Sequence, residues 1–334
     1  MRNLVFFVLI LFTGCKGNIE DIKVSFIGEA QGTYYSITYF DKNGRDFQLE
    51  IDSILTDFDN SVSLWVPNSI LSRVNKNDSS VILDDYFIGN FNISKEISEQ
   101  TNGNFDFTIG TLIKAWGFGY DHSKTINTNK IDSLLSYTGF NKVNLENGKI
   151  TKDNPNISFD FNAVAQGYSV DLIGEFLEQN NITNYLVDIG GEVKAKGSKL
   201  DDIKWKVGIE RPAKNQNDGR DLKAIAELSN ISIATSGNYR KFYEENGVRY
   251  SHTINPKTGY PAKNRLLSVS VLHKSTAYAD AYATAFMVMG FNKAKLFVEN
   301  SKSIEALFIY STEDGEFDTY GTKGFNETII EEFE

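Results

Sequence analysis

Asp280 and Thr284 form the clearest chemically useful pair in this sequence. They lie four positions apart in an alanine-rich segment, ADAYATAFMVMG, at residues 279–290. In a helix that spacing directs both side chains from one face, about one turn apart. A carboxylate and a hydroxyl suit a hard cation such as Mg²⁺, which keeps water ligands and shares its coordination shell with phosphate. The pair is therefore a candidate metal site, with an ordinary structural pair as the alternative.

A polar stretch at residues 233–261 is the next candidate. It follows an apolar run at residues 231–234, so we expect the chain to leave a strand there and to expose backbone N–H groups near Gly237. Such groups could hold an anion; a polar hairpin loop is the alternative. The candidate ligand-binding residues of this stretch are Thr235, Ser236, Gly237, Asn238 and Arg240.

His252 lies in the same stretch and is a candidate catalytic residue. Imidazole is the usual side chain for moving a proton at neutral pH. The other two histidines, His122 and His273, are interpreted as surface or turn positions. A structural role remains the alternative for His252.

A Gly-Gly pair follows a strand expected at residues 185–189. Such a pair lets the backbone approach a ligand closely, but it is also found in ordinary tight turns. Gly190, Gly191 and Glu192 are therefore candidate ligand contacts, with a plain turn as the alternative.

The elements that must position these groups alternate between strands and helices. Period-two and turn signals predict strands at residues 23–29, 33–40, 185–189 and 306–310. Helical spacing of apolar residues predicts helices at residues 47–58, 170–177, 277–289 and 293–299. The expected fold class is α/β or α+β, with mixed sheets and packed helices, because periodicity alone does not separate the two classes.

Length and charge narrow the function classes. The 334 residues allow one large domain or two intimate subdomains. The net charge of −10 argues against nucleic-acid binding, which needs a basic face, and against electrostatic docking on anionic lipid.

The N-terminus has the pattern of a cleaved secretory signal. A basic start precedes an apolar run at residues 4–12, and the small residues Thr13 and Gly14 follow. The run is too short to span a bilayer. Cys15, the only cysteine, then resembles the lipid-modified first residue of a bacterial lipoprotein; a fortuitous cysteine is the alternative. We expect a signal peptide at residues 1–14, a lipid-anchored tether at 15–22 and one domain at 23–334.

Five segments in this order resemble the ApbE family of flavin transferases, which are FAD:protein FMN transferases. Besides residues 233–261, they are GTYYSITY at 32–39, GNFDFTIGTLIKAWGFG at 103–119, DFNAVAQGYSVD at 160–171 and the alanine-rich segment at 279–290. The resemblance implies an ApbE-like flavin transferase fold. It also implies that Asp280 and Thr284 bind Mg²⁺ together with a backbone carbonyl of the AVAQG segment, for which Ala165 is our choice.

The resemblance also implies contacts to FAD. Trp65 occupies the place of an aromatic residue that packs on the flavin ring, although a tryptophan after a helix is usually core. Asp106 is either a polar anchor for the nucleotide or a turn residue, and Trp116 and Phe118 are expected to shape the pocket wall. The remaining implied FAD contacts are Gly32, Thr33 and Gln166.

Two residues depart from the family pattern. Gln166 stands where many members have lysine, so a cation near the phosphates is missing, and Asn255 stands where aspartate is frequent. Neither change removes a predicted metal ligand, and Mg²⁺ can neutralise the same phosphate charge.

The expected activity is Mg²⁺-dependent transfer of FMN from FAD to a Thr or Ser hydroxyl of a target protein, with release of AMP. Asp280 would act through the metal, and His252 would assist deprotonation of the hydroxyl. By resemblance the target could be a membrane redox-pump subunit, and the lipoprotein would face the periplasm or the cell exterior. The alternatives are an FAD pyrophosphatase that yields FMN and AMP, and a non-catalytic FAD-binding lipoprotein.

Overall fold

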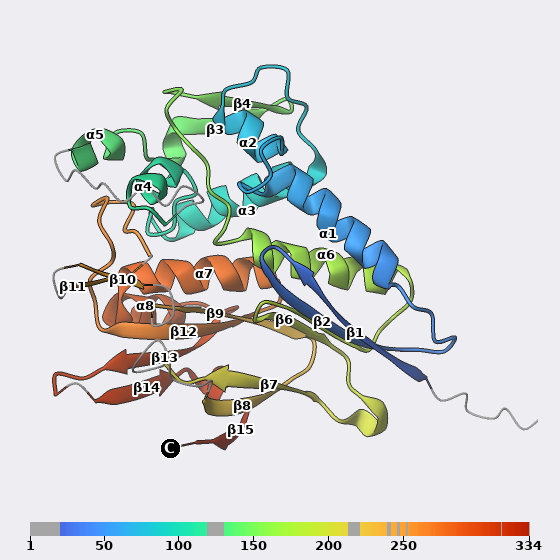
Figure 1. Cartoon of the computed structure of the whole chain (residues 1–334). Helices are drawn as coiled ribbons and strands as arrows, with labels where there is room; N and C mark the ends of the chain where they lie inside the picture. Colours follow the sequence, from blue (N-terminus) through green and yellow to red (C-terminus); the bar gives the residue numbers. More distant parts are fainter. Residues whose placement is uncertain are drawn as a thin grey trace, which may run out of the picture.

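The computed structural model describes residues 21–118, 130–212, 221–238, 242–245, 248–251, 253–314 and 316–333. Figure 1 shows a large sheet with helices packed on one side and a smaller sheet on the other. Within these ranges, no helix is both long and apolar enough to cross a membrane.

The large sheet has eight strands, and each neighbouring pair is antiparallel. In spatial order they are β1 (Ile22–Ala30), β2 (Thr33–Asp41), β5 (Tyr185–Ile189), β6 (Glu192–Lys196), β9 (Ile231–Gly237), β12 (Leu266–His273), β13 (Glu305–Ser311) and β14 (Phe317–Gly321). The predicted fold class is confirmed in its α+β form, because the strands are antiparallel rather than mixed.

A tight turn joins β1 to β2. Gln31 and Gly32 both have positive φ, 54° and 72°, and they are the two loop residues between the paired Ala30 and Thr33. Two positive φ values in a two-residue loop are typical of a type I′ hairpin, whose twist matches that of the strands.

The helices on one face bury the predicted apolar stripes. In α1 (Gln48–Val62) the buried side chains include Ile51, Leu55 and Phe58, one face of the helix. By contrast, α7 (Thr276–Met289) is buried almost all round, which its many alanines allow. The other long helices are α3 (Asp85–Gln100), α6 (Ala165–Gln179) and α8 (Phe291–Glu299).

The opposite face of the large sheet is covered by a three-stranded sheet in the order β15-β8-β7. Its strands are β7 (Trp205–Glu210), β8 (Leu222–Leu228) and β15 (Ile329–Glu332). Trp205 and Leu228 pack with Ile233 of β9 in one buried cluster, which also contains Phe325 of α9 (Lys323–Asn326).

Short elements complete the fold around α1 and α3 and at the ends of the sheets. They are α2 (Ile70–Asn75), α4 (Gly110–Ala115), α5 (Ile131–Leu135), the 3-10 helices η2 (Phe140–Lys142) and η3 (Leu200–Asp202), and the two-stranded pairs β3 (Val143–Glu146) with β4 (Lys149–Lys152) and β10 (Phe242–Glu245) with β11 (Val248–Ser251).

The predicted exit from the strand after Ala234 is wrong. β9 continues through Gly237, where Thr235 pairs with Ser270 and Gly237 with Ser268 of β12. The next residue, Asn238, still donates its backbone N–H to Leu267 O at 3.0 Å. Pairing with β12 overrides the turn propensity of this polar segment, so it forms no anion-binding turn at Gly237.

Candidate active site

Asp280 lies in the middle of α7 and is only 7% exposed. The backbone N–H of Gly167 donates to its Oδ2 at 3.2 Å, the hydrogen bond that Asp280 receives from the described residues. Burial raises the pKa of Asp280 to about 7, against the smaller lowering effect of the Gly167 N–H. Because this donor compensates only part of a negative charge, the buried carboxyl group needs either a nearby cation when ionised or a bound proton that keeps it neutral.

The close approach of α6 to α7 depends on Gly167. A Cβ atom at this position would lie 2.5 Å from the carbonyl oxygen of Thr276, which no side chain tolerates. Glycine therefore brings the first turn of α6 against α7, where its N–H reaches the Asp280 carboxylate.

Thr284 lies one turn after Asp280, as the spacing predicts. Its hydroxyl is within hydrogen-bond distance of Ser236 Oγ, 3.1 Å away on β9. Side chains of a strand alternate between faces, so Thr235 points to the opposite side of the sheet from Ser236. Thr235 Oγ1 instead lies 2.7 Å from Ser270 Oγ. The structure thus brings Ser236 to the Asp280–Thr284 helix and separates Thr235 from it.

The predicted carbonyl ligand Ala165 is the first residue of α6, so its carbonyl points along the helix toward the C-terminal end, whereas the Gly167 N–H points back toward Asp280. That N–H belongs to the first turn of the helix, whose N–H groups have no intrahelical acceptor, and it donates to Asp280. No contact between described residues tests the Ala165 carbonyl as a metal ligand, so that assignment stays a prediction.

Gln166 holds the Gly-Gly turn in place. Its Nε2 donates to Ile189 O at 2.7 Å and to Glu192 Oε2 at 2.5 Å. Gly190 has a φ of 64°, and a Cβ atom there would lie 2.1 Å from Gln166 Nε2. The turn thus needs glycine, and the Gln166 amide is committed to protein acceptors.

The tip of the β1–β2 hairpin reaches the same place. Thr33 lies against Gly190, since a Cβ atom at Gly190 would be 2.7 Å from Thr33 Cγ2. Beside Gly32, Gln31 accepts a hydrogen bond from Ser169 Oγ of α6 at 3.3 Å. The buried Nε2 of Gln31 has no acceptor among the described residues. Sequence reasoning missed Gln31, whose orphaned amide marks this tip as a place where a ligand could accept a hydrogen bond.

Asp171 is a second residue that the sequence did not single out. It caps α7, accepting from the backbone N–H groups of Thr276 and Ala277, each at 3.0 Å. Its other donors are the hydroxyls of Ser275 and Thr276 and, at 2.8 Å, Lys194 Nζ. The Ser-Thr-Ala start at residues 275–277 is typical of a capped helix, but no local pattern in the sequence indicates that the distant Asp171 takes part in the cap.

The structure favours different alternatives for Trp65 and Asp106. Trp65 is 59% exposed, so the core alternative is wrong and its ring is free to meet a ligand. Asp106 is buried, and its carboxylate accepts from Thr108 N, Thr108 Oγ1 and Phe140 N. Burial raises the pKa of Asp106, and these hydrogen bonds oppose that effect. The contacts support the turn-residue alternative, because both oxygens are already used by the protein.

The remaining residues singled out in the sequence lie partly within and partly outside the described part of the chain. Trp116 is buried and donates its indole N–H to Gly259 O at 2.7 Å, and its place in a pocket wall stays a prediction. Asn255 accepts from Lys257 N at 2.9 Å within the same turn. Asn238 donates to Leu266 O at 3.0 Å. The predicted residues that lie outside the described part of the chain are Cys15, His122, Arg240 and His252.

The candidate metal ligands around Asp280 are oxygen atoms. Among the residues that the structure describes, no three His, Cys, Asp or Glu side chains gather as a metal cluster. A cation at Asp280 would therefore be held by one carboxylate with neutral oxygens, a set typical of Mg²⁺ with water and phosphate completing it.

Comparison with known proteins agrees with this architecture. The ApbE family profile matches residues 31–308. An FAD:protein FMN transferase from Vibrio cholerae is 35% identical over 328 residues, covering 95% of each chain. Another from Haemophilus influenzae is 32% identical over 306 residues, covering 87% of this chain and 88% of the relative.

Solved structures give the same result. The flavin transferase ApbE from Vibrio cholerae has a TM-score of 0.82 at 33% identity, covering 92% of this chain and 99% of that one. The apo form of the Pseudomonas stutzeri flavinyl transferase ApbE also scores 0.82, at 31% identity, covering 93% and 98%. With a profile match over most of the sequence and relatives spanning nearly its full length, this chain belongs to the ApbE family.

Proposed function

We propose that this protein is an FAD:protein FMN transferase that uses Mg²⁺ bound at Asp280. The family and the names of its relatives support transfer of FMN from FAD to a protein. The observation that carries the metal proposal is the buried Asp280 carboxylate, whose charge the described residues compensate only through Gly167 N–H.

The available donors fit a hard cation. Asp280 would supply the charged ligand, Thr284 a hydroxyl one turn away, and Ala165 a backbone carbonyl. When bound, Mg²⁺ would neutralise phosphate charge and favour departure of the leaving group.

The chain's own residues would orient the reactants. Trp65 offers an exposed ring for the flavin, and Gln166 fixes the Gly190 turn near the hairpin tip. The oxygen of a Thr or Ser hydroxyl attacks the FMN phosphorus, the bond from that phosphorus to the bridging oxygen breaks, and AMP leaves with that oxygen. His252 is proposed to take the hydroxyl proton. Alignment of the two reacting groups supplies much of the rate.

The decisive experiment follows FAD, covalent protein-bound flavin, FMN and AMP in one sample. With Mg²⁺ and an acceptor peptide containing threonine, we expect covalent flavin and AMP in equal amounts. Rapid release of free FMN at a rate that does not depend on the acceptor peptide would favour a pyrophosphatase. Tight FAD binding without AMP formation would favour a carrier. Omission of Mg²⁺ should abolish AMP formation.

The proposal includes attachment to a membrane from the outside. Residues 1–14 would be removed as a signal peptide, and lipid on Cys15 would anchor the domain through a tether at residues 15–22. Mass analysis of the N-terminal peptide should show the lipid. Cys15→Ser should release the protein from the membrane fraction while transfer to a soluble peptide continues; a membrane-bound Cys15→Ser protein would contradict the anchor.

A further inference from the structure

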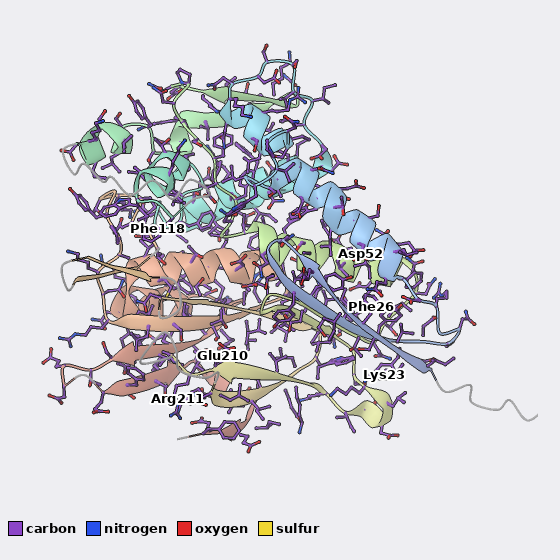
Figure 2. All side chains as sticks on the ribbon, in the orientation of Figure 1. Lys23, Phe26, Asp52, Phe118, Glu210 and Arg211 are labelled. Atoms are coloured by element: carbon purple, nitrogen blue, oxygen red, sulfur yellow. The ribbon has the colours of Figure 1, made fainter. Side chains whose placement is uncertain are left out.

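β1 forms one edge of the eight-stranded sheet. It pairs with β2 over nine residues without a register shift, whereas β14 at the opposite edge has five. Figure 2 shows Lys23 and Phe26 along β1, with Asp52 on α1 nearby. A long, regular edge presents a row of backbone groups to any strand that can reach it.

The hydrogen bonds of β2 show which groups of β1 face outward. Tyr34 O accepts from Gly190 N, and Phe40 N donates to Asn184 O, each at 3.0 Å, so both residues direct their backbone groups toward β5. Their partners on β1, Glu29 and Lys23, must then face away from β2. By alternation the outward-facing residues are Lys23, Ser25, Ile27 and Glu29.

The middle of this edge is poorly protected. Sheet edges are usually blunted by proline, bulges, shortness or charged side chains, and the charged residues of β1, Lys23 and Glu29, lie near its two ends. The segment Ile22–Ala30 has no proline, and Ile27 at its centre is 71% exposed. Within the described part of the chain, no hydrogen bond uses the outward backbone groups of β1. The edge is therefore available for an added strand.

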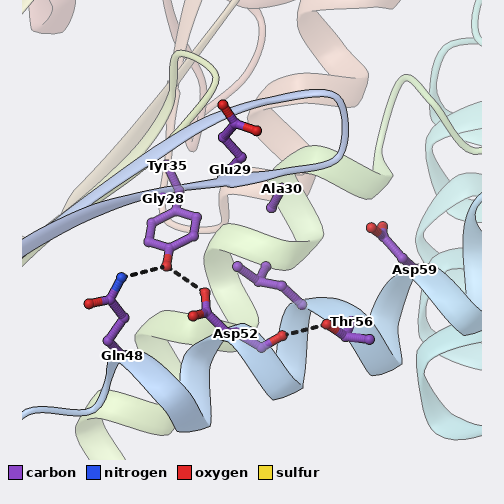
Figure 3. Close-up of a pocket in the computed structure, with 9 residues that line it drawn as sticks. Gly28, Glu29, Ala30, Tyr35, Gln48, Asp52, Thr56 and Asp59 are labelled. Carbon is purple, nitrogen blue, oxygen red and sulfur yellow. Dashed lines mark hydrogen bonds between the residues drawn. The ribbon is translucent and has the colours of Figure 1, made fainter.

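A cavity of about 340 Å³ lies between β1 and α1. In Figure 3, Gly28 and Ala30 of β1 face α1, from which Asp52 and Asp59 project. The described lining of the cavity contains no Lys or Arg. A segment added to β1 would have one row of side chains beside this acidic helix face.

The two carboxylates of α1 differ in their partners. Asp52 accepts from Tyr35 Oη at 2.5 Å. Asp59 is half-buried, and no hydrogen bond or ion pair joins its carboxylate to the described residues. Burial raises the pKa of Asp59, as expected where no cation is near. A cationic side chain would remove this imbalance, so charge complementarity selects a basic occupant.

The edge leads to the candidate active site. β1 ends at the hairpin whose tip carries Gln31 against Ser169 and Thr33 against Gly190. An extended segment that follows β1 to this tip would deliver its next residues to the proposed FAD phosphates.

We propose that an extended segment of the acceptor protein binds as an added strand to the outward edge of β1, with a Lys or Arg beside Asp59. The edge of β1 and the neighbouring cavity between β1 and α1 together form what we call the groove. Main-chain hydrogen bonds hold such a segment, and side-chain pockets select it. The segment places its hydroxyl residue just past the hairpin tip. This inference rests on the proposed function, because it concerns the acceptor of the same transfer.

The charge can be tested with matched variants on α1. Asp59→Asn should raise the KM for a lysine-containing threonine peptide by about five- to tenfold, the effect of one partly desolvated ion pair. Asp57→Asn, the same change at an exposed position of α1, should alter it by less than about twofold. Both variants should have the same FAD affinity as the parent and the same low rate of FAD hydrolysis. Equal KM values in the two variants would overturn the assignment of Asp59.

The edge can be tested without touching the hairpin. Ile27→Pro removes an outward N–H that β2 does not use, whereas Ile27→Thr keeps the N–H and removes similar apolar surface. We expect Ile27→Pro to raise the peptide KM at least about fivefold, the value of one lost hydrogen bond, and Ile27→Thr to leave it nearly unchanged. A parent-like KM in a folded Ile27→Pro protein would exclude strand addition.

A peptide library gives an independent readout. Unstructured peptides with one fixed threonine and randomised flanks would be flavinylated with FAD and Mg²⁺, then sequenced by mass. We expect Lys or Arg at one fixed distance from the threonine and exclusion of proline at every second position, because alternate residues use their N–H groups. Asp59→Lys should invert the charge preference toward Asp or Glu.

Two failures are distinguishable. Flavinylated peptides without charge preference or alternation would overturn the groove while leaving the transferase function intact. A library that stays unmodified would also contradict the groove, because an open edge must accept an unstructured peptide. AMP release in that same sample would then show whether FAD is still cleaved, which separates the groove from the proposed chemistry.

Discussion

Asp171 lies on α6 and Asp280 on α7, the helix packed against it, but the two carboxylates differ in how many hydrogen-bond donors they have. Asp171 accepts hydrogen bonds from two backbone N–H groups, two hydroxyls and Lys194. Asp280 accepts a 3.2 Å bond from Gly167. The first carboxylate is satisfied by the fold, and the second is left to be satisfied by something else.

This difference separates a structural aspartate from a functional one. Both lie in segments that resemble the family, so sequence pattern alone does not distinguish their roles. A carboxylate surrounded by donors stabilises a helix terminus, whereas a buried and poorly paired carboxylate costs stability and persists where a ligand uses it. The comparison predicts that substitutions at the two positions have opposite signatures.

Asp280→Ala should abolish transfer while the protein stays folded. We expect AMP release from FAD to fall at least about 1,000-fold at saturating Mg²⁺, because the charged metal ligand is gone. Thr284→Ala, which removes a neutral donor, should lose less. Product analysis by chromatography measures both. Near-parent turnover in Asp280→Ala would remove the metal assignment and with it the contrast between the two carboxylates.

Asp171→Ala should show the reverse signature, with lost stability as the primary effect. The change leaves Lys194 without its partner and the first N–H groups of α7 without an acceptor. We expect the free energy of unfolding to fall by roughly 2 to 4 kcal/mol. Denaturant titration measures it, with Asp171→Asn as a control that keeps acceptor oxygen. An unchanged unfolding midpoint in Asp171→Ala would show that Asp171 does not support α7.

Metal-free stability should depend on pH through Asp280. Its pKa is about 7 in the fold, above the ordinary value of 3.8, so the folded protein holds this proton more tightly. The corresponding stabilisation is complete below about pH 4 and is lost as pH rises through 7. With a chelator, the parent should therefore lose roughly 1 to 3 kcal/mol relative to Asp280→Asn between pH 4.5 and pH 8.

Thermal unfolding of the two proteins at both pH values checks this difference. Added Mg²⁺ should restore the parent at pH 8 and leave Asp280→Asn unaffected. A gap between the two proteins that is independent of pH would mean that Asp280 does not titrate in the fold.

Much of the architecture was predictable from local pattern. The apolar stripe containing Ile51, Leu55 and Phe58 became the buried face of α1, and the segment around Gly32 became a hairpin. The polar run Thr235 to Gly237 was misjudged, because its turn propensity is weaker than the pairing that β12 supplies across the sheet. The sequence of the segment itself does not indicate which distant strand it pairs with.

At the candidate site, too, local spacing was predictable from the sequence and long-range contacts were not. The spacing of Asp280 and Thr284 predicted a shared helix face, which α7 provides. The hydrogen bond from Gly167 N–H to Asp280, the cap at Asp171 and the orphaned amide of Gln31 arise only when distant segments meet. Such contacts depend on tertiary packing, which a single sequence does not specify locally.

Gln166→Lys offers the smallest effect and the finest test of the comparison. A lysine would restore the charge common in the family, but Glu192 already lies within hydrogen-bond distance of the Gln166 amide. An ion pair with Glu192 would satisfy the new charge before phosphate does, so we expect less than about a threefold change in transfer rate. Glu192→Gln in the same protein should free the lysine and raise the rate further, by up to about tenfold. Gln166→Met controls for length without charge. A large gain from Gln166→Lys alone would show that Glu192 leaves this position, and that a charge can act on FAD even where the fold supplies it with a partner.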